Sequence, residues 1–529
     1  MSIVVQQITY IHPDNDVLFQ NVNFTLNKGQ KVALVGVNGS GKSTLLHIIA
    51  GGLKPTEGDI STSSIPYYVP QHFGQYNHQT IAQALQIEKK LKALQAIIAG
   101  DASIENFTNL DDDWNIEERS VAALSDWGID YLQLNQEMGT LSGGEKTKVF
   151  LAGLQIHTPD IILMDEPTNH MDSSGRQKLY DFVKSGKASI LLVSHDITLL
   201  RLLPLTYELT SKGITVYGGN YDFYKEQKEL QLNALQTSLE AKEKELRVAK
   251  KVARETAERK QKLDARGKKL SEKKGISKLG MGKLKETAEK STNKLTEVHA
   301  EKSAALAESV NQLRNNLPNT NLMKVDFSSS NLHTGKILIK AHQINFAYNS
   351  IALWDDPLNF TLRSGDRIAI KGDNGAGKTT LIKLITGELQ PITGTLEKAD
   401  FSYVYIDQEY SIIQNELTVY EQAQEYNTRH FLEHEIKMLL SRYLFPFDTW
   451  NKPCSKLSGG EKMRLVFCCL MISNQTPDIF ILDEPTNNLD IHSIEIITAV
   501  IREYKGTILV ISHDQYFMQE IGVDKSIEL

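Results

Sequence analysis

The same four short motifs occur twice in this 529-residue chain, in the same order, and this repetition restricts the possible folds more than any other feature. Each motif of the first half has a partner in the second half that differs at only a few positions. The pairs are Gly36–Thr44 with Gly372–Thr380, Leu141–Lys146 with Leu457–Lys462, Met164–Asp172 with Leu482–Asp490, and Leu191–Asp196 with Leu509–Asp514. The chain therefore contains two copies of one domain, which we predict at residues 1–224 (the first copy) and 331–529 (the second copy).

The spacing between partner residues shows where the copies differ in length. Lys42 and Lys378 are 336 positions apart, whereas Ser142 and Ser458 are 316 positions apart. Between these residues the first copy is therefore 20 residues longer than the second, and the additional residues lie between Gln71 and Ser142. We predict an insertion at about residues 88–125 of the first copy. Its acidic run, Asp111–Asp113, argues against nucleic acid as its target. A protein partner and a plain pair of surface helices both fit.

The segment between the copies, residues 225–330, has a different composition. It is rich in Lys, Glu, Ala, Leu and Gln, and it contains no proline before Pro318. Apolar residues recur three, four or seven positions apart in two stretches, at Leu232, Leu235, Leu239, Leu246, Ala249 and Ala253, and at Leu306, Val310, Leu313 and Leu317. This spacing predicts two long helices that pack antiparallel as a hairpin. Glycines between them predict a tip near Gly267–Gly282.

Positive charge concentrates in the same segment, although the whole chain has a net charge of −7. Residues 247–294 contain 17 Lys and Arg against 6 Asp and Glu. The lysines predicted at the tip are Lys268, Lys269, Lys273, Lys274, Lys278, Lys283 and Lys285. A basic segment between two acidic halves favours contact with a polyanion. The alternative is a solvated helical spacer whose mixture of Lys and Glu has no partner.

Two further observations argue against a secreted protein, a membrane-spanning protein and a protein with a cysteine metal site. The first residues lack a basic region followed by an apolar run, and no apolar stretch approaches the ~18 residues that cross a membrane. The cysteines, Cys454, Cys468 and Cys469, have no metal-binding spacing and are expected to be reduced core thiols. We therefore expect a cytosolic protein without membrane contact.

The first motif of each copy, GxxxxGK[ST], is typical of a phosphate-binding loop (P-loop). Each run follows an apolar stretch that predicts a strand, at 31–35 and 367–370, and precedes one that predicts a helix, at 45–50 and 381–386. Backbone N–H groups of such a loop and the helix N-terminus bind anions. The predicted nucleotide-binding residues are Gly36, Val37, Asn38, Gly39, Ser40, Gly41, Lys42, Ser43 and Thr44, and Gly372, Asp373, Asn374, Gly375, Ala376, Gly377, Lys378, Thr379 and Thr380. Lys42 and Lys378 would reach the β- and γ-phosphates, and Ser43 and Thr379 would bind Mg²⁺.

The third and fourth motifs supply the predicted catalytic groups. Apolar runs at 161–164 and 479–482 end in Asp-Glu, which places Asp165 and Asp483 as Mg²⁺ ligands and Glu166 and Glu484 as general bases. His195 and His513 follow their respective glutamates at the same separation along the chain. A lone histidine is usually structural, but this repeated spacing favours contact with the γ-phosphate. We also expect Gln71 and Gln408 to help hold metal and water.

The second motif, LSGGEK, can cover the side of a triphosphate that one copy leaves open. Its serine hydroxyl, glycine N–H groups and following helix N-terminus form a second anion-binding cap. The residues are Ser142, Gly143 and Gly144, and Ser458, Gly459 and Gly460.

Together these motifs resemble the ATP-binding cassette (ABC) superfamily over nearly everything except the hairpin. The resemblance implies an α/β fold with two P-loop ATP-binding cassette domains joined by an antiparallel α-helical hairpin linker. It implies a head-to-tail arrangement within one monomeric chain, in which Lys42 faces Ser458 and Lys378 faces Ser142. Both sites would hydrolyse Mg-ATP. Tyr10 and Tyr348 would stack on adenine; Phe346 rivals Tyr348, and a core role is the alternative.

The long basic linker and the run YGGNYDFY at Tyr217–Tyr224 resemble the ABC-F family. That resemblance implies ribosome binding near the tRNA exit site, with the hairpin tip reaching rRNA and tRNA near the peptidyl-transferase centre. Three functions are compatible with the sequence: a translation factor, a factor that protects the ribosome from antibiotics, and the ATPase subunit of a membrane transporter. The short insertion weakens the resemblance to the best-understood translation factors and makes the second function a serious rival to the first. The third function leaves the basic hairpin without a purpose.

Overall fold

The protein is described from a computed structural model, which divides into two compact units. The first unit comprises residues 1–222 and 322–529 and holds both copies, and the second is the helical segment 223–321. The structure describes residues 2–273, 298, 300–314, 333, 335–349, 351–373, 375–473, 476–487 and 489–529. Within that first range, residues 260, 261 and 263–273 are described by their backbone alone.

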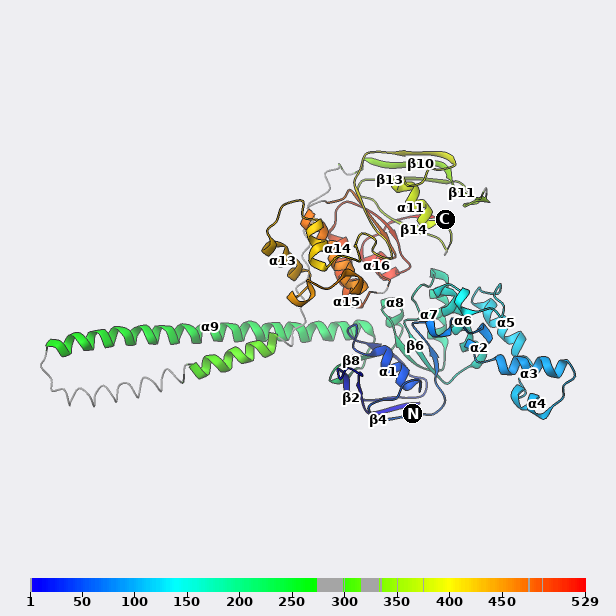
Figure 1. The fold of residues 1–529 in the computed structure, drawn as a ribbon, viewed down its shortest axis with the longest axis horizontal. Coiled ribbons are helices and arrows are strands. Elements are labelled where there is room, and N and C mark those ends of the chain that lie inside the picture. The colour runs from blue at the N-terminus through cyan, green and yellow to red at the C-terminus, as the bar shows by residue number, and fades with distance from the viewer. Residues whose placement is uncertain are drawn as a thin grey trace. The chain divides into compact units, whose positions relative to one another are not determined.

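The first copy is built on a six-stranded sheet in which only β8 and β9 pair antiparallel (Figure 1). Its strands, in sheet order, are β5 (Tyr67–Val69), β6 (Ile161–Asp165), β7 (Ser189–Val193), β3 (Lys31–Val35), β8 (Leu205–Thr210) and β9 (Gly213–Tyr217). Strands β6 and β7 are buried along their whole length, which is why they appear in the sequence as unbroken apolar runs. A separate antiparallel sheet has the order β2 (Val17–Leu26), β1 (Ile3–Ile11), β4 (Glu57–Thr62).

One helix joins these two sheets into a common core. Helix α1 (Lys42–Ile49) buries Leu45, Leu46 and Ile49 in a cluster with side chains of β1, β2, β3 and β6. The remaining helices of the first copy are α2 (Ile81–Ala84), α3 (Glu88–Ile98), α4 (Ile104–Leu110), α5 (Ile116–Asp126), α6 (Gly143–His157), α7 (Ser173–Ser185) and α8 (Ile197–Arg201), with short 3₁₀ turns at Gly74–Tyr76 and Met138–Thr140.

The second copy repeats this plan with five strands, all parallel, in its main sheet. Their order is β16 (Tyr403–Ile406), β17 (Ile479–Asp483), β18 (Thr507–Ile511), β14 (Arg367–Lys371) and β19 (Lys525–Glu528). Its antiparallel strands are β13 (Leu358–Arg363), β10 (Ile337–Asn345) and β15 (Thr393–Lys398), with the short pair β11 (Ala347–Tyr348) and β12 (Ile351–Ala352). The helices are α11 (Lys378–Thr386), α12 (Val419–Glu425), α13 (Glu433–Arg442), α14 (Gly459–Ser473), α15 (Ile491–Glu503) and α16 (Gln515–Glu520), with 3₁₀ turns at Phe447–Thr449 and Cys454–Lys456.

The predicted strands and helices around the motifs are confirmed within one to three residues at each end, and all three cysteines are buried and free. The insertion is shorter than the predicted range. Helix α5 begins at Ile116 and α13 begins at Glu433, at nearly equal separations from Ser142 and Ser458, so α5 belongs to the shared plan. The additional residues are the pair α3 and α4, which fits the interpretation as surface helices.

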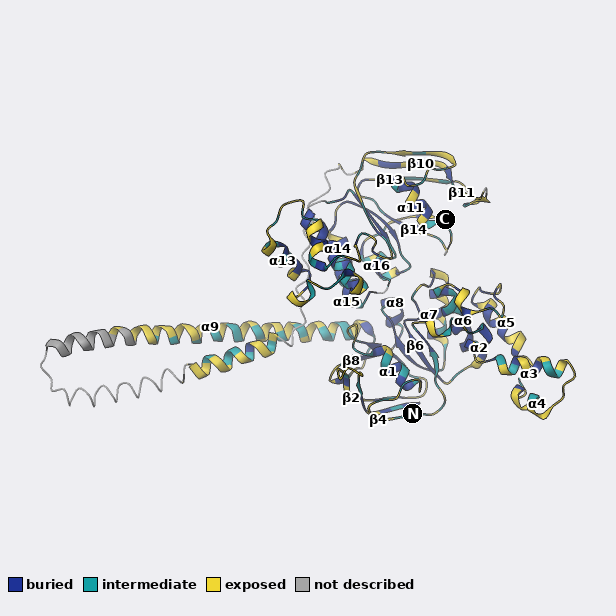
Figure 2. Ribbon diagram, in the orientation of Figure 1, coloured by how far each residue is buried: buried dark blue, intermediate teal, exposed yellow. Residues whose placement is uncertain are grey.

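The second unit contains the long helix α9 (Tyr221–Lys273) and a second helical stretch at residues 300–314. The predicted apolar seam is present: Leu232, Leu235 and Leu239 are half-buried on a helix that also has many exposed residues, and Val310 is buried (Figure 2). An ion pair of 2.6 Å joins Arg314 Nη2 to Glu243 Oε1, so the two helices contact each other. The linker is therefore a helical hairpin.

The predicted start of the hairpin tip, at Gly267, is wrong. Gly267 does not break the helix, because α9 continues beyond it as far as Lys273. Lys268, Lys269 and Lys273 accordingly belong to α9, whereas Lys274, Lys278, Lys283 and Lys285 lie outside the described residues. Within the described part of the chain, no helix combines the length and apolar character needed to cross a membrane.

Candidate active site

Each P-loop connects the end of a central strand to the start of a helix. Gly41 and Gly377 directly precede α1 and α11, and both have a φ of 92°, a conformation that disfavours side chains. A Cβ atom at Gly41 would lie 2.7 Å from Leu18 Cδ2, and one at Gly377 would lie 2.6 Å from Leu353 Cδ2. Glycine is therefore required at both positions.

The loop lysines are held by their own loops. Lys42 Nζ donates hydrogen bonds of 2.8 Å to Gly36 O and 3.3 Å to Val37 O. Lys378 Nζ makes the same contacts with Gly372 O at 2.8 Å and Asp373 O at 3.2 Å. Each ammonium group is thus already held beside its loop. A bound phosphate can replace the carbonyl oxygens as the partner of the ammonium group.

A cavity of about 350 Å³ brings the predicted residues of the first copy together. It is lined by Asn38, Gly39, Gly41, Lys42, Ser43, Thr44, Gln71, Asp165, Glu166 and His195, together with His12, Leu18 and Val193. These side chains come from the P-loop and from the ends of β5, β6 and β7. Ligands of open α/β sheets bind at this edge, where the carboxyl ends of the parallel strands meet. In the second copy, Gln408 is exposed just beyond β16.

The aspartates at the ends of β6 and β17 have the properties of cation ligands. Burial raises the pKa of Asp165 to about 6, while hydrogen bonds from Ser43 and Tyr68 act in the opposite direction. Its Oδ1 atom is buried and, among the described residues, has no hydrogen-bond partner. Asp483 accepts a 3.0 Å hydrogen bond from Tyr405, and burial raises its pKa as well. A carboxylate oxygen without a donor, beside a serine hydroxyl, fits a hard divalent cation.

The predicted bases have an unusual backbone conformation in both copies. Glu166 has a φ of 49° and Glu484 a φ of 48°, a region that costs a residue other than glycine about 1–3 kcal/mol. Their N–H groups donate 2.8 Å hydrogen bonds to Val193 O and Ile511 O, which fix each glutamate against the neighbouring strand. Strain of this kind persists where the surrounding structure holds it, commonly at functional sites.

Burial also sets the protonation states of the bases and their histidines. It raises the pKa of Glu166 and of Glu484 to about 7 and lowers the pKa of His195 and of His513 to about 4. The Nε2 atom of His195 lies 3.3 Å from Glu166 Oε1, and that of His513 lies 3.5 Å from Glu484 Oε1. Each pair therefore joins a neutral imidazole to a carboxyl group poised to exchange a proton near neutral pH.

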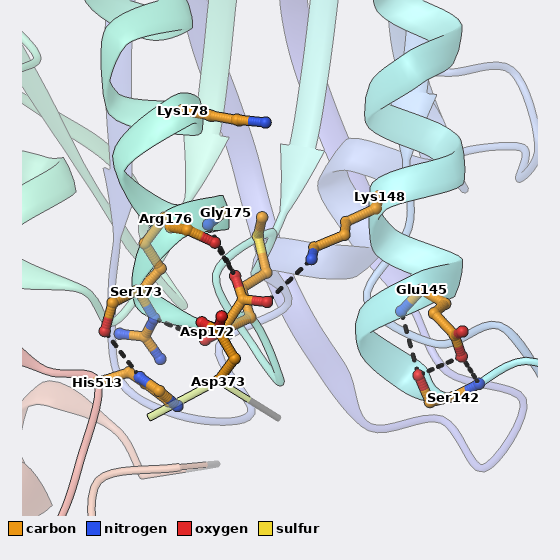
Figure 3. A network of polar contacts seen from close by, with 12 residues as sticks. Ser142, Glu145, Lys148, Asp172, Ser173, Gly175, Arg176, Lys178, Asp373 and His513 are labelled. Atoms are coloured by element: carbon orange, nitrogen blue, oxygen red, sulfur yellow. Dashed lines mark hydrogen bonds and ion pairs between the residues drawn. The ribbon is translucent and has the colours of Figure 1, made fainter. Parts of the chain in front are cut away.

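The LSGGEK motif forms a helix N-terminus in both copies. Ser142 caps α6, and Glu145 accepts hydrogen bonds from its backbone N–H at 2.7 Å and from its hydroxyl at 2.6 Å (Figure 3). At the start of α14, Ser458 N donates to Glu461 Oε2 at 2.7 Å. The glycines that follow, Gly143 and Gly144, and Gly459 and Gly460, form the first turn of each helix.

A second cavity, of about 440 Å³, contains residues of both copies. It is lined by Ser142, Gly144, Glu145, Lys148, His170, Asp172 and Lys178 of the first copy and by Asp373 in the P-loop of the second (Figure 3). The expected pairing of the Lys378 loop with Ser142 is consistent with this cavity. The cavity around Lys42 is not lined by Ser458, so the pairing of those two residues stays a prediction.

The structure places His12, and not Tyr10, in the first cavity. Tyr10 packs against the core of the first copy, and its ring lies edge-on to His12 with centroids 5.5 Å apart. In the second copy Phe346 and Tyr348 form the same edge-on pair at 5.0 Å. Tyr10 therefore corresponds to Phe346, and His12 corresponds to the exposed Tyr348. The offset of 336 positions that relates Lys42 to Lys378 also relates His12 to Tyr348, and this signal could have identified the residue.

We expect His12→Ala to weaken nucleotide binding at the Lys42 site about fivefold, because a ring stacked on a base contributes roughly 1 kcal/mol. Titration of a fluorescent ATP analogue into protein that also carries Lys378→Ala isolates this site. Tyr10→Leu, which keeps an apolar side chain in the core, is the matched control and should leave the affinity within twofold. The assignment is wrong if Tyr10→Leu weakens binding and His12→Ala does not.

Comparison with known proteins identifies the family of this chain. Residues 19–169 and 356–487 match the family described as ABC transporter, once in each copy. The chain belongs to this family. Its members hydrolyse ATP, and this protein is an ATPase with two cassettes.

The similarity extends along nearly the whole chain. An uncharacterized ABC transporter ATP-binding protein of Bacillus subtilis, YfmM, is 29% identical over 96% of this chain and 94% of its own length. ABC transporter F family member 5 of Arabidopsis thaliana is 29% identical over 97% of this chain and 72% of its own length. Among solved structures, the archaeal ribosome recycling factor aABCE1, in complex with the ribosomal stalk protein aP1, has a similar fold. Its TM-score is 0.58 at 20% identity, over 97% of this chain and 86% of that one.

Proposed function

We propose that this ATPase acts on the ribosome as a member of the F type, binding near the tRNA exit site. In this proposal ATP closes the two cassettes and favours binding, and hydrolysis favours release. The observation that carries the proposal is the helical hairpin, inserted between two acidic cassettes and containing the 17 Lys and Arg of residues 247–294. A concentration of basic charge of this kind suits a nucleic-acid backbone.

The residues at each site can perform the hydrolysis with Mg²⁺. Ser43, Asp165 and Gln71 would hold the ion at the first site, and Thr379, Asp483 and Gln408 would hold it at the second. When bound, Mg²⁺ neutralises the charge of the β- and γ-phosphates. Lys42 and Lys378 bind the same phosphates, and the LSGGEK helix of the opposite cassette covers them. Glu166 and Glu484 accept the proton of the attacking water, and His195 and His513 orient the γ-phosphate.

A protective role against antibiotics is the second candidate within the same family. The small size of the insertion, reduced to α3 and α4, favours it over a translation factor with a larger arm at this place. Resistance of a drug-sensitive host to peptidyl-transferase inhibitors, scored with and without the protein, separates the two roles.

We expect the variant that carries both Glu166→Gln and Glu484→Gln to sediment with ribosomes when ATP is present and to stay in the supernatant without it. The variant keeps the nucleotide contacts but lacks the bases, so the ATP-bound state accumulates.

Replacing Lys268, Lys269, Lys273 and Lys274 by Gln in this background should weaken ribosome binding and reduce its salt dependence by about four phosphate contacts. Lys89→Gln and Lys92→Gln, in the helical insertion, are controls that neutralise lysines outside the hairpin. Failure to sediment at low salt would count against ribosome binding, and an unchanged salt slope would exclude the tip as the contact.

A further inference from the structure

The two ATP sites differ in residues that lie just outside the repeated motifs. Helices α7 and α15 follow the Asp-Glu motifs and begin after equivalent aspartate caps, Asp172 and Asp490. When the copies are aligned on these aspartates, the first turn of α7 contains Ser173 and Arg176 where α15 contains Ile491 and Ile494. The motifs are thus nearly identical, but the residues that follow them differ in charge and hydrogen-bonding capacity.

Ser173 contacts the catalytic histidine of the other cassette. Its Oγ atom lies 2.8 Å from Nδ1 of His513, whose Nε2 faces Glu484 (Figure 3). A neutral imidazole has one N–H donor and one acceptor nitrogen, and a serine hydroxyl can complement either one. The contact therefore fixes the orientation of the His513 ring.

The corresponding histidine of the first copy lacks this support. His195 Nδ1 is buried and has no hydrogen-bond partner within the part of the chain that the structure describes. Ile491, at the position of Ser173, has no polar side-chain atom to offer. The ring of His195 is therefore oriented by packing and by the contact of its Nε2 with Glu166, and its Nδ1 adds no second polar contact.

Arg176 is a second residue of the first copy whose counterpart in the second copy, Ile494, carries no charge. Its side chain is buried, Nη1 lies 3.5 Å from Asp196 Oδ2, and Nε donates a 3.3 Å hydrogen bond to Met171 O. Tyr180 donates a 2.5 Å hydrogen bond to the same Oδ2 atom, which fixes the carboxylate. Arg176, Asp514 of the second copy and Ile494 all line one small cavity. The charge of Arg176 acts against the larger effect of burial, which raises the pKa of Glu484, and adds to the effects of burial and Lys378, which lower the pKa of His513.

We propose that Ser173 is a positioning residue that acts across the cassette contact on His513, and that the Lys378 site therefore hydrolyses ATP faster than the Lys42 site. The catalytic groups themselves are the same at both sites. The difference comes from a histidine that is held at Nδ1 by a hydroxyl at one site and a histidine without this contact at the other. This inference needs ATP hydrolysis at both sites but does not depend on ribosome binding.

Single-turnover hydrolysis in two backgrounds tests this proposal. Glu166→Gln leaves the Lys378 site active, and Glu484→Gln leaves the Lys42 site active. Ser173→Ile should slow hydrolysis about fivefold in the first background and less than twofold in the second, with ATP affinity unchanged in both. Ser173→Thr, which restores a hydroxyl, should recover most of the rate. Ser185→Ala, at the other end of α7, is the control.

The reciprocal change provides a test that does not depend on a loss of activity. Ile491→Ser offers His195 the hydroxyl that it lacks and should accelerate the Lys42 site about twofold to fivefold in the Glu484→Gln background. Equal slowing of both sites by Ser173→Ile, or no slowing at either, would overturn the proposal. Equal rates at the two sites of the parent protein would overturn it as well.

Discussion

Replacing Lys42 and Lys378 together by alanine should reduce phosphate release from ATP by about 10³-fold. Removing one donor that stabilises transition-state charge typically costs 10²–10³ in rate, and here the donor is a full positive charge. Among the described residues, each ammonium group donates its hydrogen bonds to carbonyl oxygens of its own loop. The loss should therefore reflect contacts with phosphate and not collapse of the loop.

A matched control is available on the strand that leads into the first loop. Lys31 opens β3, and its Nζ atom donates a 3.0 Å hydrogen bond to Lys184 O, away from the predicted phosphates. Lys31→Ala should leave phosphate release within twofold. If the double lysine variant retains its activity, the two P-loops are not the source of hydrolysis, and the arrangement of both ATP sites inferred above is wrong.

The strand and helix ends that carry the predicted catalytic residues could be located from the sequence alone, because each is encoded locally. A P-loop needs a strand, a turn with positive φ and a helix N-terminus, and all three are encoded within a few residues of Lys42. The same is true of Glu166, which directly follows the last residue of a buried strand. Repetition of each pattern in the second copy made chance agreement implausible. These features are confirmed as strand and helix ends.

His12 lines the cavity around Lys42 and the predicted Tyr10 does not, because their strand is irregular. The pairing of β1 with β2 shifts register between Ile8 and Tyr10 and again between Tyr10 and Ile11. Simple alternation along the strand therefore does not show which aromatic side chain faces the nucleotide. The internal repeat was the better guide, because it pairs His12 with Tyr348.

Two other features needed tertiary structure. Gly267 was expected to end a helix, but one glycine costs a helix only about 1 kcal/mol, and the surrounding Lys, Ala and Arg favour helix strongly. The contact of Ser173 with His513 joins residues 340 positions apart. It depends on how the cassettes meet, which no local pattern encodes.

Replacing Glu166 and Glu484 by glutamine should have opposite effects on hydrolysis and on stability. Loss of a general base should slow hydrolysis by about 10²–10⁴-fold. In the absence of nucleotide, however, the same variant should be more stable than the parent protein above pH 7. Burial raises the pKa of each carboxyl group from 4.5 in the unfolded chain to about 7 in the folded protein.

The sign of the stability effect follows from proton binding. Below pH 4.5 both states hold the proton, and the carboxyl groups do not affect folding. As the pH rises to 7, the unfolded chain releases its protons first, so the folded protein becomes progressively less stable. Above pH 7 the full effect is present, about 2 kcal/mol per site once relaxation is allowed for. Glutamine has no proton to release, and it can keep the hydrogen bond that Glu166 Oε2 accepts from His195 N.

Urea unfolding of the nucleotide-free protein at pH 5 and pH 8 measures this difference. The free energy of unfolding should be higher in the variant at pH 8, and the difference from the parent protein should shrink several-fold at pH 5.

Asp172→Asn is a control for which we expect the opposite effect on stability. Burial acts to raise the pKa of Asp172, but pairing with Lys148 and the hydrogen bond from Gly175 N keep that pKa below its usual value. This substitution should therefore destabilise the protein at pH 8. If the glutamine variants are less stable than the parent at pH 8, burial does not raise the pKa of these glutamates. The strained, buried carboxyl groups would then be structural and not poised for proton transfer.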